Sequence, residues 1–285
     1  MTQVEHGPWP TPSTLPPALT STLKPTPQPD SLFLTALAPE IRLMIYEYVF
    51  GSTDLHILIH NQKLVTVPCA HDPATGSDGH EHCIDLPFDR PPGMDWPAGS
   101  SIAKLSPTNK RRGRAILSVC SAIYLEAVDI LYRRHTFRFN GIFSFIVFPR
   151  AIIPHHANML HHVRLTLALF VHDDMISLYF NNAFSRSWPG WDQEYASGDT
   201  PWQCTWNTMG ELKSLHTLVV TLIAQSNTPP NNLTWHQSLP SDFEIPLFEP
   251  MKQVCCPDFL LRINWPHTGI LQDEYPFRVE HIENE

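Results

Sequence analysis

The apolar residues between positions 39 and 51 recur every three or four residues, as they do on one face of an amphipathic helix. The residues of this stripe are Ile41, Met44, Ile45 and Tyr48. Pro39 suits the first position of a helix, where its missing N–H costs nothing, and Gly51 suits the left-handed conformation that ends one. The pattern predicts a helix that begins at Pro39 and stops at Gly51.

A second apolar stripe at helical spacing lies between Arg114 and Arg134. It predicts one helix of about twenty residues with a broad apolar face. The residues that form this face are Ile116, Leu117, Cys120, Ile123, Tyr124, Ala127, Ile130 and Leu131.

Runs rich in β-branched and aromatic residues predict the strands. Two runs, 56–60 and 63–67, flank Asn61-Gln62 and predict a hairpin. Further along, strand-like runs at 136–140, 162–170, 216–224 and 259–264 alternate with helix-like runs at 142–148, 201–213 and 246–254. Alternation of this kind favours parallel strands joined by crossover helices. The expected fold class is therefore mixed α/β: a helical head joined to an irregular strand and helix array, with a short degenerate solenoid of the leucine-rich-repeat kind left open because strand spacing is uneven.

Proline-rich stretches indicate which parts of the chain are not expected to fold into regular structure. The chain has 285 residues and 28 prolines. Residues 1–30 are rich in proline and hold almost no large apolar groups, so we expect a disordered arm. Residues 68–113 are dominated by Pro, Gly, Asp and Ser and predict an irregular loop insertion. The domain prediction is thus an arm followed by a single folded domain over 31–285.

The charge and the cysteines narrow the class of protein. With 19 basic and 28 acidic residues the net charge is −9, which argues against a general nucleic-acid binder. We expect no membrane span, because no apolar run reaches the roughly 20 residues needed, and no signal peptide. The six cysteines show no repeated spacing, so we expect reduced thiols and an intracellular protein, cytoplasmic or nuclear rather than secreted.

The segment after the hairpin holds five candidate metal ligands close together in the sequence. They are Cys69, His71, His80, His82 and Cys83. Because thiolates and imidazoles are the usual ligands of zinc, one hypothesis is a metal-binding or pocket-containing enzyme built on residues 69–83. The spacing matches no common zinc motif, however, and in a chain with 16 histidines chance clustering is expected. We favour the interpretation that no cofactor is bound.

A basic run precedes the second helix, formed by Lys110, Arg111, Arg112 and Arg114. It is either a nuclear import signal or phosphate contact, or a solvated stretch before the helix. Two histidine pairs, His155-His156 and His161-His162, are expected at surface and cap positions.

The sequence contains no motif of nucleophilic catalysis or phosphate binding. There is no Gly-x-Ser-x-Gly elbow, no Gly-x-x-x-x-Gly-Lys loop and no Gly-x-Gly-x-x-Gly turn. Four tryptophans gather in the second half of the chain, where they either line a ligand site or belong to the core: Trp188, Trp191, Trp202 and Trp206. We favour the core, and we expect a protein that is not an enzyme.

Two blocks of the sequence resemble a large fungal family of unknown function whose head is similar to an F-box. The first block reads Leu37-Ala38-Pro39-Glu40-Ile41-Arg42-x-x-Ile45-Tyr46-x-Tyr48-Val49-Phe50-Gly51. The second reads Leu117-x-x-Cys120-x-x-x-Tyr124-x-Glu126-Ala127-x-x-x-Leu131-Tyr132, followed by Thr136-Phe137-x-Phe139. This chain departs from the family pattern at Ser121, where arginine is usual, and at Ala38.

The resemblance implies a protein-interaction role, since F-box heads bind the Skp1 adaptor of a ubiquitin ligase while the rest of the chain selects a target. The adaptor-binding face would then consist of Leu37, Pro39, Ile41, Ile45 and Val49. The alternative is that these residues are core and pack against the second helix. We favour the core, because an ordinary F-box is compact, whereas about sixty residues separate the two helices here.

Overall fold

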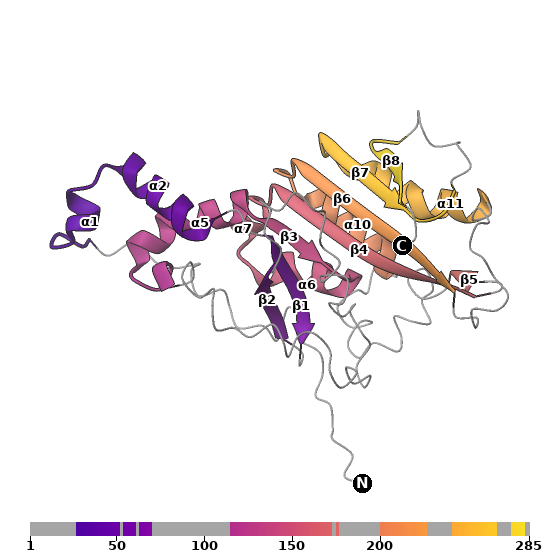
Figure 1. Ribbon diagram of the computed structural model, residues 1–285, viewed down its shortest axis with the longest axis horizontal. Coiled ribbons are helices and arrows are strands. Elements are labelled where there is room, and N and C mark those ends of the chain that lie inside the picture. The colour runs from indigo at the N-terminus through magenta and orange to yellow at the C-terminus, as the bar shows by residue number, and fades with distance from the viewer. Residues whose placement is uncertain are drawn as a thin grey trace, which may run out of the picture.

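The computed structural model describes residues 27–51, 54–60, 63–69, 115–172, 175–176, 200–226, 241–266 and 275–282. The helices are α1 (Leu32–Thr35), α2 (Pro39–Phe50), α5 (Ser121–Arg134), α6 (Ile142–Ala151), α7 (Pro154–Ala157), α10 (Pro201–Glu211), α11 (Ser241–Phe248) and the 3₁₀ helix η3 (Glu249–Gln253). The strands are β1 (Leu55–His60), β2 (Lys63–Pro68), β3 (Thr136–Phe139), β4 (His162–His172), β5 (Met175–Ile176), β6 (Thr217–Ser226), β7 (Asp258–Ile263) and β8 (Arg278–His281). Figure 1 shows α1, α2 and the start of α5 projecting from one end of the sheet.

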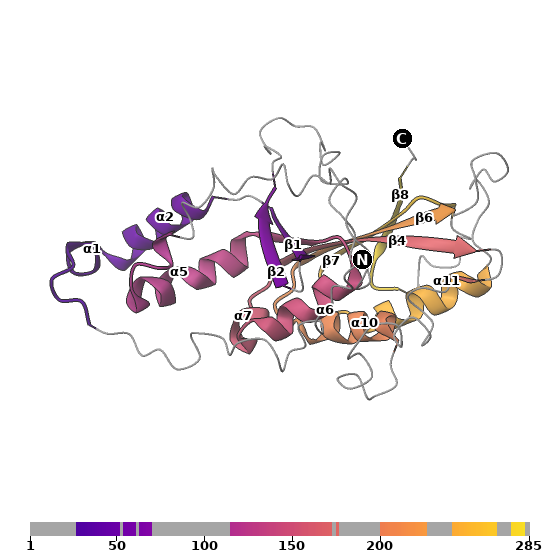
Figure 2. The same ribbon diagram turned by 90° about the horizontal axis from the view of Figure 1, so that it is seen from below.

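The sheet follows the order of the chain. Its strand order is β2-β1-β3-β4-β6-β7-β8, and the short β5 pairs with the end of β4. β1 and β2 form the expected antiparallel hairpin, whereas β1, β3, β4, β6, β7 and β8 run parallel. The crossover helices α6, α10 and α11 lie on one side of the sheet (Figure 2). The mixed α/β prediction is therefore confirmed, and the parallel strands β1, β3, β4, β6, β7 and β8 lie beside one another in chain order.

The main core lies between the sheet and these helices. Every second residue of the central strands points into it, including Leu165, Leu167 and Val220, because side chains alternate across a strand. Trp202 and Trp206 of α10 pack edge to face, 5.2 Å between ring centroids, and both are buried. These two tryptophans are thus core residues.

Helix α10 begins where the sequence indicated. Thr200 accepts a hydrogen bond from the Gln203 backbone N–H at 3.2 Å, and the Gln203 side chain accepts one from the Thr200 N–H at 2.9 Å. This capping box, with Pro201 at the first helical position, satisfies N–H groups that a helix start leaves unpaired.

A buried asparagine extends the sheet beyond the end of β7. The side chain of Asn264 accepts a hydrogen bond from the Ala224 N–H at 2.8 Å and donates one to the Ala224 carbonyl at 3.2 Å. It therefore takes the place of a strand residue beside β6.

A second, smaller core holds the helical end together. Tyr46 of α2 and Ile123 and Ala127 of α5 are its buried members. Packed around them, partly exposed, are Phe33, Leu34, Phe50, Ile116, Leu117, Cys120 and Ile130. We call α1, α2 and α5 the helical head.

Three sequence predictions need correction. Helix α5 begins only at Ser121, because Cys120 is extended (φ −161°, ψ 165°) and separates α5 from the helical residues 115–116 and the turn at 117–119. Pro246 does not open a helix but lies inside α11, which starts at Ser241. Strand β8 was not predicted, because a four-residue edge strand carries too short a pattern.

Several predictions fall outside the described residues. These are the arm up to residue 26, nearly all of the insertion, from residue 70 onward, and the assignment of Trp188 and Trp191. Within the described part of the chain, no helix is long and apolar enough to cross a membrane.

Candidate functional site

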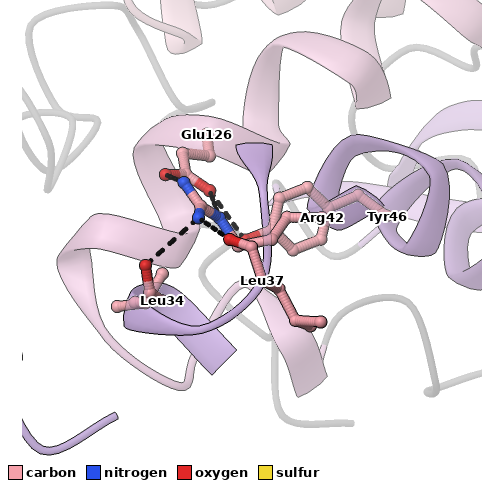
Figure 3. A network of polar contacts seen from close by, with 5 residues as sticks. All are labelled: Leu34, Leu37, Arg42, Tyr46 and Glu126. Carbon is pink, nitrogen blue, oxygen red and sulfur yellow. Dashed lines mark hydrogen bonds and ion pairs between the residues drawn. The ribbon is translucent and has the colours of Figure 1, made fainter. Parts of the chain in front are cut away.

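An arginine at the centre of the head joins its three helices (Figure 3). Arg42 of α2 donates two hydrogen bonds to the carboxylate of Glu126 on α5, from Nε at 2.9 Å and from Nη2 at 2.7 Å. Its Nη1 donates to the carbonyl oxygens of Leu34 and Leu37, at 3.2 and 2.7 Å. A two-pronged arginine–carboxylate pair fixes orientation as well as distance, so Arg42 sets how α2 lies on α5 and on the chain leaving α1.

Tyr46 completes this network one helical turn further on. Its hydroxyl donates to Glu126 at 3.0 Å. Burial and the Glu126 carboxylate raise the pKa of Tyr46, and the hydrogen bond from Arg42 lowers the pKa of Glu126. The tyrosine therefore stays neutral and the carboxylate charged at neutral pH. We call Arg42, Tyr46 and Glu126 the head network.

The opposite side of α2 carries apolar side chains that the described protein leaves exposed. The exposed fractions are 45% for Ile41, 64% for Met44 and 89% for Tyr48. With about 100° between successive residues, these three lie within about 60° of one another around the helix axis. We call them the α2 stripe. They belong to the stripe that the sequence pattern predicted, but it faces outward.

The five residues expected to form an adaptor face, or the core, are divided by the structure. Pro39 and Ile41 are exposed, whereas Leu37, Ile45 and Val49 are partly buried. The buried positions of α2 are Arg42 and Tyr46 instead. The core interpretation is therefore wrong for Pro39 and Ile41.

Arg42 and Tyr46 lie in the first of the two blocks that resemble the family, and Glu126 lies in the second, but the sequence pattern assigned no role to any of them. The available signal was a cation and a carboxylate in two blocks that are far apart in the chain. Nothing in the spacing showed that they meet, because 84 residues separate Arg42 from Glu126.

The candidate metal ligands are almost all outside the described residues. Cys69 is buried at the end of β2, and its backbone N–H donates to the Asp54 carbonyl at 2.8 Å. His71, His80, His82 and Cys83 lie outside the described ranges, as does the basic run Lys110, Arg111, Arg112 and Arg114. Among the residues that are described, no three His, Cys, Asp or Glu side chains are grouped to hold a metal ion.

The two histidine pairs were expected at surface and cap positions, and His156 differs from this expectation. His156 is buried, and its ring stacks on Tyr132 with 4.9 Å between centroids. His161 and His162 are half-buried beside the exposed His216. Burial lowers the pKa of His156, His161 and His162, and His216 adds to the lowering for the last two.

Fold and head together define an α/β protein with parallel strands in chain order and a small helical head that exposes an apolar stripe. A family model described as "Domain of unknown function (DUF7730)" matches residues 26–278, and the chain belongs to this family. Neither the curated proteins nor the solved structures gave a match.

Proposed function

We propose that this chain is a non-enzymatic protein-interaction module whose α2 stripe binds a partner protein. The observation that supports this most directly is the exposure of Ile41, Met44 and Tyr48 together on one face of a helix. Contiguous exposed apolar side chains are typical of protein-binding surfaces. The lack of any recognisable catalytic motif in the sequence supports the non-enzymatic part of the proposal.

The contacts that hold α2 in the head come from its inner side, away from the α2 stripe. Its inner side is held by Arg42, Glu126 and Tyr46, and by the small core around Ile123 and Ala127. Because these groups fix α2 from behind, the outward side chains are free to contact another protein. A prearranged surface loses less conformational entropy on binding.

We propose a Skp1-type adaptor as the partner. The resemblance of the first block to an F-box head points to this class, and α2 is the helix that this block forms. The target-selecting role would then fall to the sheet. In this proposal the binding residues are Ile41, Met44 and Tyr48, with Ile45 and Pro39 beside them.

The test is direct binding between the full chain and a purified Skp1-type adaptor, measured by calorimetry. Met44→Lys places a charge in the middle of the α2 stripe and should weaken binding at least tenfold. Ile245→Lys is the matched control, since Ile245 is 48% exposed on α11, away from the head. This control should bind within about twofold of the wild type.

Two results would overturn the adaptor proposal. One is no binding by the wild type at concentrations near 100 μM, which corresponds to less than about 5.5 kcal/mol of binding free energy. The other is a dimer of the chain in light scattering that Met44→Lys dissociates, because the α2 stripe would then bind a second copy.

A further inference from the structure

Strand β8 forms one edge of the sheet. Among the strands that the structure describes, its only neighbour is β7. Phe277 and Val279 pack in and against the main core on the helix side. Since side chains alternate across a strand, Arg278 and Glu280 point to the opposite face of the sheet, where both are exposed. An edge strand of this kind is a place where a further strand can add to a sheet.

The backbone of β8 shows which residues face away from β7. The N–H of Ile282, directly after β8, donates to the carbonyl oxygen of Ile263 on β7 at 2.8 Å. The N–H and C=O groups of successive strand residues point to alternate sides within a sheet, so those of Glu280 also face β7. Those of Val279 and His281 then face outward. These two residues therefore carry backbone groups that an added strand would pair with.

The charges of β8 are complementary to those of a second β8. Arg278 and Glu280 lie on either side of Val279. If two copies of the strand pair antiparallel about a two-fold axis at Val279, Arg278 of each copy lies directly opposite Glu280 of the other. An axis at Arg278 or at Glu280 would instead place like charges opposite each other, which destabilises a sheet. The outward backbone groups and the charges therefore select the same register.

We propose that β8 pairs antiparallel with β8 of a second copy of this chain, so that one sheet runs through a symmetric dimer. The two Val279 residues would exchange N–H···O bonds, and Arg278 and Glu280 would form the closer, non-hydrogen-bonded pairs beside them. Within each copy Arg278 forms an ion pair with Asp258 at 2.8 Å. Glu280 forms one with Arg262, also at 2.8 Å. The dimer would join these pairs into rows of alternating charge. Charged side chains usually keep an edge strand from pairing, but this alternation favours the chain itself as the partner. The proposal does not depend on the α2 stripe.

The test is sedimentation equilibrium of the full chain at concentrations up to about 1 mM, a range in which weak association is detected. We expect a monomer–dimer equilibrium. Val279→Pro removes the outward N–H at the centre of the pair, and proline is tolerated on an edge strand where the N–H points away from the sheet. This variant should weaken the dimer about tenfold or more. Val279→Ala is the matched control: it also shortens the side chain but keeps the N–H, and should dimerise within about threefold of the wild type.

Charge reversal tests the register and includes its own control for folding. Arg278→Glu alone should not dimerise, and neither should Glu280→Arg alone, because each places like charges opposite each other across the two-fold axis. An equal mixture of the two variants should form a heterodimer, since both cross-strand pairs then join opposite charges again. Association of the mixture would also show that β8 is intact in both variants.

A chain that stays monomeric at every concentration would overturn the proposal, as would a dimer that Val279→Pro leaves as strong as Val279→Ala does. Should Val279→Pro fail to fold, the mixture of charge-reversed variants decides, and the lack of a heterodimer would rule out the β8 contact. Met44→Lys separates this dimer from one formed through the head. It should leave the β8 dimer unchanged, and a dimer that Met44→Lys dissociates would place the contact on the α2 stripe instead.

Discussion

The burial of single side chains in α2 does not follow from their residue type. Arg42, a charged residue near the start of α2, is buried, while Tyr48 on the same helix is nearly fully exposed. This difference in exposure follows from the hydrogen-bond partners that are available to Arg42. Arg42 meets a carboxylate and two carbonyl oxygens, so burying its charge is compensated. The Tyr48 ring needs no such partner, because keeping an aromatic ring in water costs only a modest free energy.

Buried histidines should make the fold sensitive to mild acid. Burial lowers the pKa of His156 from its ordinary value of 6.5, an effect that the nearby Asp129 partly offsets. The unfolded chain therefore binds a proton more readily than the folded one. The contribution of His156 is complete above pH 6.5 and is lost as the pH falls below it, by at most about 1.4 kcal/mol per pH unit for one proton.

The measurement is the free energy of unfolding by denaturant between pH 7.5 and 5.5. His156→Phe keeps an aromatic ring against Tyr132 and should flatten the pH dependence. His155→Gln changes the exposed neighbour, which only adds to the lowering of the His156 pKa that burial causes, and should keep most of the wild-type slope. An unchanged slope in His156→Phe would show that other groups control the response.

At the scale of elements, the head network joins α2 to α5. Tyr46→Phe removes one hydrogen bond to Glu126 and keeps the ring in the small core. We expect a loss of about 1 kcal/mol in the free energy of unfolding, the usual contribution of such a bond. Tyr48→Phe, the same change on the exposed side of the same helix, should cost nearly nothing. Equal losses in the two variants would contradict the role of the head network.

The elements themselves were largely predictable, because their signals are local. Pro39, Gly51, Thr200 and Pro201 mark helix ends through their own backbone and capping chemistry. The end of α5 nearest Cys120 was not predictable in this way. Ile116 and Leu117 pack in the head core from before the break at 117–120, so the apolar spacing continues where the helix is interrupted.

At the scale of the whole molecule, two cores of unequal size should give two levels of stability. The head core has three buried members in the described chain, whereas the main core runs under the entire parallel part of the sheet. We therefore expect native-state hydrogen exchange to show α2 amides opening at a lower free energy than those of β4 and β6. Identical opening free energies, equal to that of global unfolding, would show that head and sheet unfold as one unit.

The sequence by itself determined the fold class, most helices and strands, and the apolar stripe of the first helix. Each of these depends on spacing or capping within one segment, and spacing is what a sequence displays. Only the tertiary structure decided which way that stripe faces. Its direction depends on Arg42 and Tyr46 meeting Glu126, which follows them by 84 and 80 residues in the chain. The register that sets His56 of β1 beside Arg138 of β3, and Arg138 beside Arg164 of β4, was not predictable for the same reason, because strand register is set by pairing between distant segments.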